Sequence, residues 1–218
     1  MNQFFITFLI LPILLICAPF SHAKMNGKDV IKKVTEKYDG LTNLKADFKQ
    51  TFEWELAEQT QTVSGTIYLR AGDNYRVETE DQLIITDGKT VWTYSKKDNQ
   101  VIIDLMEKSQ ENPLPKDLLF KYSKDYNPTH VEEEKLDDNE VYVVLLLPKD
   151  ENEAFIKSMK IWVDAKTWFT RKIEQVDIND NINTYTVSNI QEGIELASDL
   201  FKFEIPDTTE VVDLRENE

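Results

Sequence analysis

Alternation of apolar and polar residues along most of the chain limits the possible folds more than any other feature. In the stretch LKADFKQTFEWEL, apolar Ala46, Phe48, Phe52 and Trp54 alternate with charged or polar side chains, and Gln50 is the one polar residue on the apolar side. Successive side chains of a β-strand point to opposite faces of the sheet. The stretch is therefore typical of a strand with one solvated face.

Further stretches of this kind follow at short intervals, separated by turn-forming pairs such as Asp87-Gly88. We expect strands at 62–70, 75–79, 83–86, 90–94, 101–105, 130–136, 141–147, 155–163, 168–178, 184–190 and 201–205. Strands joined by such short links pair as an antiparallel meander. An amphipathic helix at 29–38, with Asp29 as its cap, and a short helical stretch at 117–122 are the expected helical elements.

A sheet of this width has to curl or close, because two small helical elements cannot cover it if it stays flat. The predicted fold class is mainly β: an incomplete, strongly curled antiparallel β-barrel of about ten to eleven strands with a small helical lid or plug. The interior of such a barrel is too wide for its own side chains to fill. It would hold either a plug or a ligand.

One hairpin carries apolar surface on both faces of its expected strand. In the stretch DGKTVWTY, Val91 points to one face, whereas Trp92 and Tyr94 point to the other. An outer face that is apolar must be covered by another part of the chain or serve as a functional surface. We expect Trp92 to point toward the interior.

The N-terminus has the features of an export signal. The first 23 residues contain no Asp, Glu, Lys or Arg, and Ser21-His22-Ala23 offers small residues where a signal peptidase reads them. We expect residues 1–23 to be a cleaved signal peptide and residues 24–218 to be a single domain. A lipidated Cys17 is the alternative, which the bulky Ile16 before it disfavours.

The composition of the mature chain restricts its partners. Without Cys17 it has no cysteine, so disulfides and thiolate chemistry are excluded. The net charge of −15 disfavours nucleic acid and anionic membrane surfaces as electrostatic partners. We therefore expect no nucleic-acid partner.

Motifs of catalysis are missing from the sequence. Residues 24–218 contain one histidine, His130, next to the glutamate run Glu132–Glu134, and this arrangement is typical of a solvated strand edge. No nucleophile elbow, phosphate-binding glycine loop or metal-ligand spacing occurs. We expect no enzymatic activity, no cofactor and no metal. A lipid hydrolase that uses two of the 40 acidic residues is the enzymatic alternative.

Several stretches occur together in an order that is characteristic of one family. They are LKADFKQTF at 44–52, GTIYLR at 65–70, YR at 75–76, ITDGKTVWTY at 85–94, NP at 112–113 leading into LL at 118–119, and FKFEIP at 201–206. In these stretches the chain resembles the LolA-like family of periplasmic outer-membrane lipoprotein carriers. The resemblance extends roughly from Asp29 to Arg215.

The resemblance implies an incomplete barrel whose apolar cavity takes acyl chains and is closed by a helical lid. It implies a monomeric carrier in the periplasm that takes lipoproteins from an inner-membrane release complex to an outer-membrane receptor. A periplasmic lipid or lipoprotein sensor or regulatory module with the same fold is the alternative. The residues leave open whether the cargo is a lipoprotein, a free lipid or a glycolipid.

The apolar faces predict which residues contact acyl chains. The predicted cavity residues are Phe48, Phe52, Ile67, Leu69, Val77, Ile85 and Trp92. The predicted lid residues are Val34, Tyr38, Leu118 and Leu119.

The resemblance also implies a latch for the lid. In the family, an arginine in a Lys-Arg-Pro run bonds to backbone carbonyls of the lid. The corresponding run here is Arg70-Ala71-Gly72, in which Ala71 takes the place of that arginine. Either Arg70 or Arg76 would serve as the latch, or the lid is controlled differently.

Overall fold

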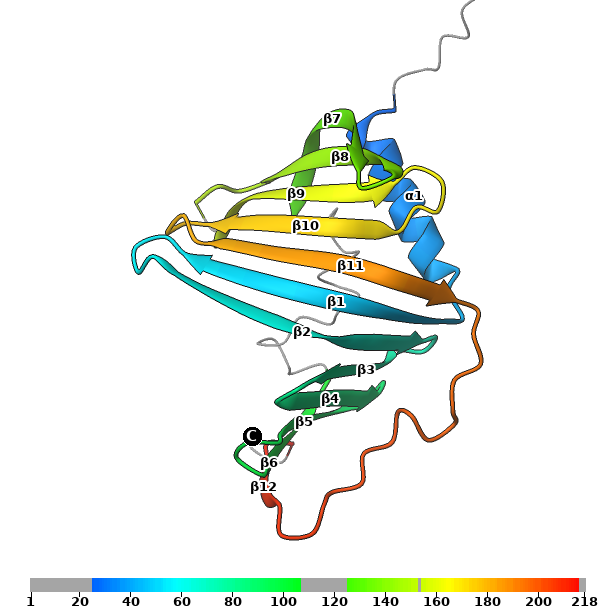
Figure 1. Cartoon of the computed structure of the whole chain (residues 1–218), viewed down its shortest axis with the longest axis vertical. Helices are drawn as coiled ribbons and strands as arrows, with labels where there is room; N and C mark the ends of the chain where they lie inside the picture. Colours follow the sequence, from blue (N-terminus) through cyan, green and yellow to red (C-terminus); the bar gives the residue numbers. More distant parts are fainter. Residues whose placement is uncertain (1–24, 107–124, 153, 216–218) are drawn as a thin grey trace, which may run out of the picture.

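A computed structural model describes residues 25–106, 125–152 and 154–215 (Figure 1). Within these ranges the chain forms one helix, α1 (Gly27–Asp39), and a single sheet of twelve strands. The strands are β1 (Asn43–Trp54), β2 (Gln59–Arg70), β3 (Asn74–Thr79), β4 (Gln82–Asp87), β5 (Thr90–Ser95), β6 (Gln100–Leu105), β7 (Tyr126–Leu136), β8 (Asn139–Pro148), β9 (Ile156–Asp164), β10 (Thr170–Asp177), β11 (Ile182–Glu192) and β12 (Glu210–Asp213). None of the described helices is long and apolar enough to span a membrane.

The sheet is one continuous, unclosed array in the order β12-β6-β5-β4-β3-β2-β1-β11-β10-β9-β8-β7. Every pair is antiparallel except β12 and β6, which run parallel. The predicted fold class of a mainly β, curled and incomplete barrel is confirmed (Figure 1). The strand expected at 201–205 is wrong, because that stretch crosses the sheet and the chain joins the edge only at β12.

Helix α1 lies on one face of the sheet, which we call the inner face; the opposite side is the outer face. Asn26 rather than Asp29 is the N-cap, and its side-chain oxygen accepts a hydrogen bond from the Asp29 backbone N–H at 3.0 Å. Val30, Ile31 and Val34 form the buried stripe of the helix. They pack with strand residues Val131, Val144, Leu146, Met159, Ile161, Val163 and Ile173 in the main core.

A second apolar cluster lies beside the last turn of α1. It consists of Leu44, Ala46, Ile67 and Phe169, with Tyr38 of the helix packed against it. The rings of Tyr38 and Phe169 meet edge to face, with centroids 5.6 Å apart. Because Tyr38 also contacts the main core, it joins the two clusters under the helix.

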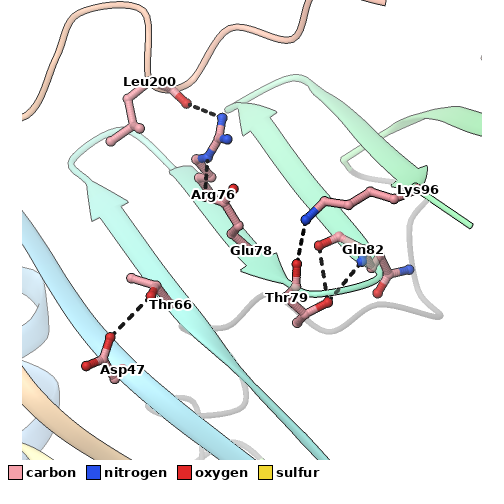
Figure 2. Close-up of polar contacts among 8 residues, drawn as sticks. All are labelled: Asp47, Thr66, Arg76, Glu78, Thr79, Gln82, Lys96 and Leu200. Atoms are coloured by element: carbon pink, nitrogen blue, oxygen red, sulfur yellow. Dashed lines mark hydrogen bonds and ion pairs between the residues drawn. The ribbon is translucent and has the colours of Figure 1, made fainter. Parts of the chain in front are cut away.

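The outer face of β2, β3, β5 and β6 is covered by the C-terminal segment, residues 194–209. Phe201 is only 1% exposed, and the Arg70 guanidinium lies 4.3 Å from the centre of its ring. Arg76 Nη1 donates a hydrogen bond to the Leu200 carbonyl at 3.4 Å (Figure 2). The ring of Phe203 packs against Trp92 and Tyr94. This segment explains why the β5 strand has two apolar faces.

Replacement of Ile31 by alanine should weaken the docking of α1. The side chain is 3% exposed in the main core, so its truncation is expected to lower the free energy of unfolding by about 2–5 kcal/mol. Urea denaturation measures the change. Lys32→Ala, at an exposed position of the same helix, is the matched control and should have a much smaller effect. Equal losses in the two variants would contradict the described orientation of the helix.

Replacement of Phe201 by alanine should loosen the C-terminal segment. The variant is expected to lose about 3–5 kcal/mol of unfolding free energy, because it leaves a cavity and removes the aromatic ring on which Arg70 stacks. Denaturant unfolding followed by tryptophan fluorescence measures the loss. Lys202→Ala, which is exposed on the same segment, is the control. A Phe201→Ala variant as stable as the wild type would show that the segment does not hold this position in solution.

Candidate functional site

The inner face of β1, β2 and β3 is largely apolar. In the strand pairing, Leu44 lies opposite Leu69 and Ala46 lies opposite Ile67, which in turn lies opposite Val77. Residues that are directly opposite in an antiparallel pair point to the same face. Five of the predicted cavity residues therefore share the inner face: Phe48, Phe52, Ile67, Leu69 and Val77.

Gly65 makes room for the ring of Phe48 on this surface. The two residues are opposite each other across β1 and β2. A Cβ at position 65 would lie 2.9 Å from Phe48 Cε1 and 2.2 Å from the Glu78 carbonyl oxygen, closer than atoms can approach. The glycine thus lets β3 pair closely with β2 and leaves room for the phenyl ring of Phe48.

The apolar surface continues to the far end of β1. Phe52 and Trp54 are partly exposed, and their ring centroids are 4.5 Å apart. Neither residue belongs to the buried clusters under α1. Trp54 was not among the predicted cavity residues, although its alternation with Phe52 in the sequence would have identified it. Phe48, Leu69 and Val77 are also only partly buried. Apolar side chains that α1 leaves partly exposed therefore form the candidate site.

Ile85 and Trp92 point away from this surface. They lie opposite each other in the β4–β5 pair, and Ile85 also pairs with Arg76 on the outer face. Trp92 packs against Phe203 of the C-terminal segment, with centroids 6.5 Å apart. The structure does not bring these two residues together with the other five. Contact of any of the seven residues with a ligand stays a prediction.

The predicted lid residues have different positions. Val34 is buried in the main core, and Tyr38 is partly buried between the two clusters. Burial raises the pKa of the Tyr38 phenol well above its ordinary value, against the opposing effects of hydrogen bonding to Thr170 and the charge of Arg171. The phenol is therefore neutral at physiological pH. Leu118 and Leu119 lie outside the described residues.

The two candidate latch residues lie on the outer face. The Arg70 guanidinium stacks on Phe201 and donates to Asn74 Oδ1 at 3.1 Å. Arg76 pairs with Glu78 at 3.4 Å and reaches the Leu200 carbonyl (Figure 2). Within the part of the chain that the structure describes, both arginines thus hold the C-terminal segment. A latch on α1 by either arginine remains a prediction.

A small cavity opens beside the C-terminal end of α1. Its volume is about 160 Å³, and it lies between the helix and the β2–β3 turn, with Tyr38, Leu41, Leu69 and Tyr75 among its lining residues. Ligand sites for small molecules usually occupy roughly 300–1,000 Å³. The wider inner face of β1–β3, rather than this cavity, is therefore the candidate binding surface.

The candidate site also contains polar residues. Their only sign in the sequence is Gln50, which breaks the alternation of apolar and polar residues in the first strand. Gln50 lies on the inner face of β1, next to Asn183 and Tyr185 of β11. None of the described residues forms a group of three or more histidine, cysteine, aspartate or glutamate side chains suited to hold a metal ion.

Known proteins with similar sequences include outer-membrane lipoprotein carriers. An outer-membrane lipoprotein carrier protein of Glaesserella parasuis is 26% identical, over 85% of this chain and 86% of its own. An uncharacterized protein of Methanocaldococcus jannaschii is 28% identical over 92% of this chain. The matched region spans only 58% of that relative's length.

Solved structures show the same fold at low sequence identity. An uncharacterized conserved protein from Thermus thermophilus aligns with a TM-score of 0.59 and 13% identity, covering 85% of this chain and 98% of its own. MucB aligns with a TM-score of 0.53 and 14% identity, covering 85% of this chain and 65% of its own.

The family model for the outer membrane lipoprotein carrier protein LolA matches residues 39–204. The match runs from the end of α1 through all eleven strands up to β11 and into the C-terminal segment that covers the outer face. It thus includes the apolar inner face and residues 194–204 of the outer cover. The chain belongs to the LolA family, as the resemblance in its sequence predicted.

Proposed function

We propose that this protein is a periplasmic carrier that binds the acyl chains of lipoproteins on the inner face of β1–β3 and takes them to the outer membrane. One observation carries the proposal: α1 covers the β7–β10 end of the inner face and leaves apolar residues of β1–β3 partly exposed. Exposed apolar side chains that are contiguous are typical of a binding surface. Membership in a family of lipoprotein carriers supports this interpretation.

Partial exposure suits a carrier better than complete enclosure does. Each methylene of an acyl chain that leaves water contributes about 0.8 kcal/mol, so complete burial of several chains would make release extremely slow. A surface such as the one around Phe48, Phe52 and Trp54 buries only part of each chain. The acidic composition, with a net charge of −15, would keep the loaded carrier from adhering to anionic membranes.

The expected export signal and the family together support transport between two membranes. The chain would be loaded by an inner-membrane release complex and would deliver its cargo to an outer-membrane receptor. Carriage requires no chemical step, so the bound ester or amide linkages should be recovered intact. A lipid hydrolase, in contrast, would release free fatty acid.

Replacement of Phe52 by glutamate tests the binding surface. A carboxylate at this position would have to be desolvated under an acyl chain, so affinity should fall at least about tenfold, or about 1.4 kcal/mol. The measurement is titration of the purified protein with a pyrene-labelled palmitoyl probe. The position is partly exposed on the inner face, so the fold should tolerate the change.

Thr62→Glu is the matched control for this experiment. Thr62 is exposed on β2 and lies opposite Thr51 on the outer face. The Thr62→Glu substitution therefore adds the same negative charge as Phe52→Glu, but on the other side of the sheet. This variant should bind the probe like the wild type. Unchanged binding by a folded Phe52→Glu variant would overturn the assignment of the inner face.

Native mass spectrometry of protein isolated from its own envelope should show a co-purifying lipoprotein or lipid, and recovery of neither would argue against carriage.

A further inference from the structure

A hydrogen-bonded polar group interrupts the apolar inner face at its centre. Gln50 Nε2 donates to Asn183 Oδ1 at 3.1 Å and to the Tyr185 hydroxyl at 3.0 Å. Asn183 Nδ2 donates to the same hydroxyl at 2.9 Å. The three residues come from neighbouring strands β1 and β11 and are all partly buried. The three residues are linked to one another by these hydrogen bonds, and Tyr185 also packs against the main core.

The bonds within this group leave hydrogen-bond donors available. The Tyr185 oxygen accepts two hydrogen bonds, which uses its acceptor capacity and leaves its own O–H as a donor. One of the two hydrogens on Asn183 Nδ2 is also left without an acceptor among the described residues. Burial raises the pKa of the Tyr185 phenol, against the effect of the bond from Asn183, so the hydroxyl keeps its proton at physiological pH.

Gln175 adds a further amide to the group. It lies directly opposite Asn183 in the β10–β11 pair and opposite Met159 in the β9–β10 pair, which places it on the inner face. The residue is 8% exposed, and its amide atoms are not among the described polar atoms that are fully buried without a partner. The side-chain amide of a glutamine carries N–H groups that can donate hydrogen bonds to a ligand on this face. A ligand that accepts hydrogen bonds would satisfy this amide.

The surroundings of the group favour an uncharged ligand. The inner-face residues paired with the group or next to it along its strands are apolar or neutral, namely Phe48, Phe52, Gln61, Val63, Met159, Ile173 and Val187. Asp177 follows Gln175 after an irregularity in the pairing, but its carboxylate accepts hydrogen bonds from Asn179 and Asn181 in the adjacent turn. No cation lies among these neighbours to pair with a phosphate.

We propose that Gln50, Gln175, Asn183 and Tyr185 form a subsite that binds the acyl carbonyl groups of the cargo, the ester or amide carbonyls that join each chain to its head group. The inference rests on the proposed function, since the chains themselves would lie on the apolar surface around Phe48 and Phe52. Carbonyl oxygens accept hydrogen bonds and carry no charge, which matches the donors described above. The subsite would fix how far a chain enters the curled sheet.

The experiment compares three probes with hexadecyl or palmitoyl chains of matched length. They are 1,2-dipalmitoylglycerol, its 1,2-dihexadecyl ether analogue without carbonyls, and N-hexadecylpalmitamide, whose single carbonyl is an amide. Affinities are measured for the full chain by native mass spectrometry with cyclodextrin as the delivery agent. The wild type should bind the diester roughly tenfold more tightly than the diether. The N-acyl probe shows whether the amide linkage of a lipopeptide is accepted as well as the ester of a glycerolipid.

Two variants remove the donors while they keep the shape of the site. Gln175→Met keeps nearly the same volume, and Asn183→Leu changes a partly exposed position. Each variant should bind the diester with a clearly smaller preference over the diether than the wild type has, and diether binding should stay within about twofold of wild type. Thr186→Val, exposed on the outer face of the same strand β11, is the control and should keep the preference for the ester.

The outcomes separate this inference from the proposed function. Equal affinity of the wild type for diester and diether would overturn the carbonyl subsite and leave acyl-chain binding intact. An ester preference that persists undiminished in both variants would also overturn it. Binding of none of the three probes would overturn the proposed function and, with it, the subsite.

Discussion

The contact between α1 and the inner face is the interaction on which the rest of the structure depends. A sheet of twelve strands that does not close has two free edges and a wide apolar surface, and strand pairing alone cannot shield that surface from water. The stripe formed by Val30, Ile31 and Val34 covers the half near β7–β10. Because the helix is only thirteen residues long, the apolar side chains of β1–β3 stay partly exposed. Among the described residues, the candidate site is the part of the inner face that α1 does not cover.

The outer face has its own cover, and this explains the position of several conspicuous residues. The C-terminal segment buries Phe201 and packs Phe203 on Trp92 and Tyr94 before it joins the sheet edge as β12. Arg70 and Arg76 hold this segment by stacking and by a hydrogen bond to its backbone. Apolar surface on both faces of a strand therefore has two separate causes here: a candidate binding surface inside and a chain segment outside.

The inner face combines an apolar wall with a small neutral polar group. Phe48 and Phe52 flank Gln50 on β1, so a chain lying on the aromatic rings would bring its head end within reach of the amides of β10 and β11. This arrangement matches an amphiphile with an uncharged linkage better than a fully apolar ligand. Gln50, the single polar residue on the apolar side of its strand, was the only sign of this group in the sequence.

The sequence by itself determined the elements and the family of this protein. Alternation with a period of two predicted most strands and the order of their turns, and it identified Phe48, Phe52, Ile67, Leu69 and Val77 as residues of apolar strand faces. Only the tertiary structure decided which face of each strand lies inside, because alternation separates two faces without saying what packs on either. The outward position of Trp92, the crossing of residues 201–205 and the meeting of Gln175 with Asn183 all depend on register and on contacts between distant segments. The alternation of apolar and polar residues along one strand does not encode such contacts. They arise only when the sheet curls, α1 packs on its inner face and the C-terminal segment packs on its outer face.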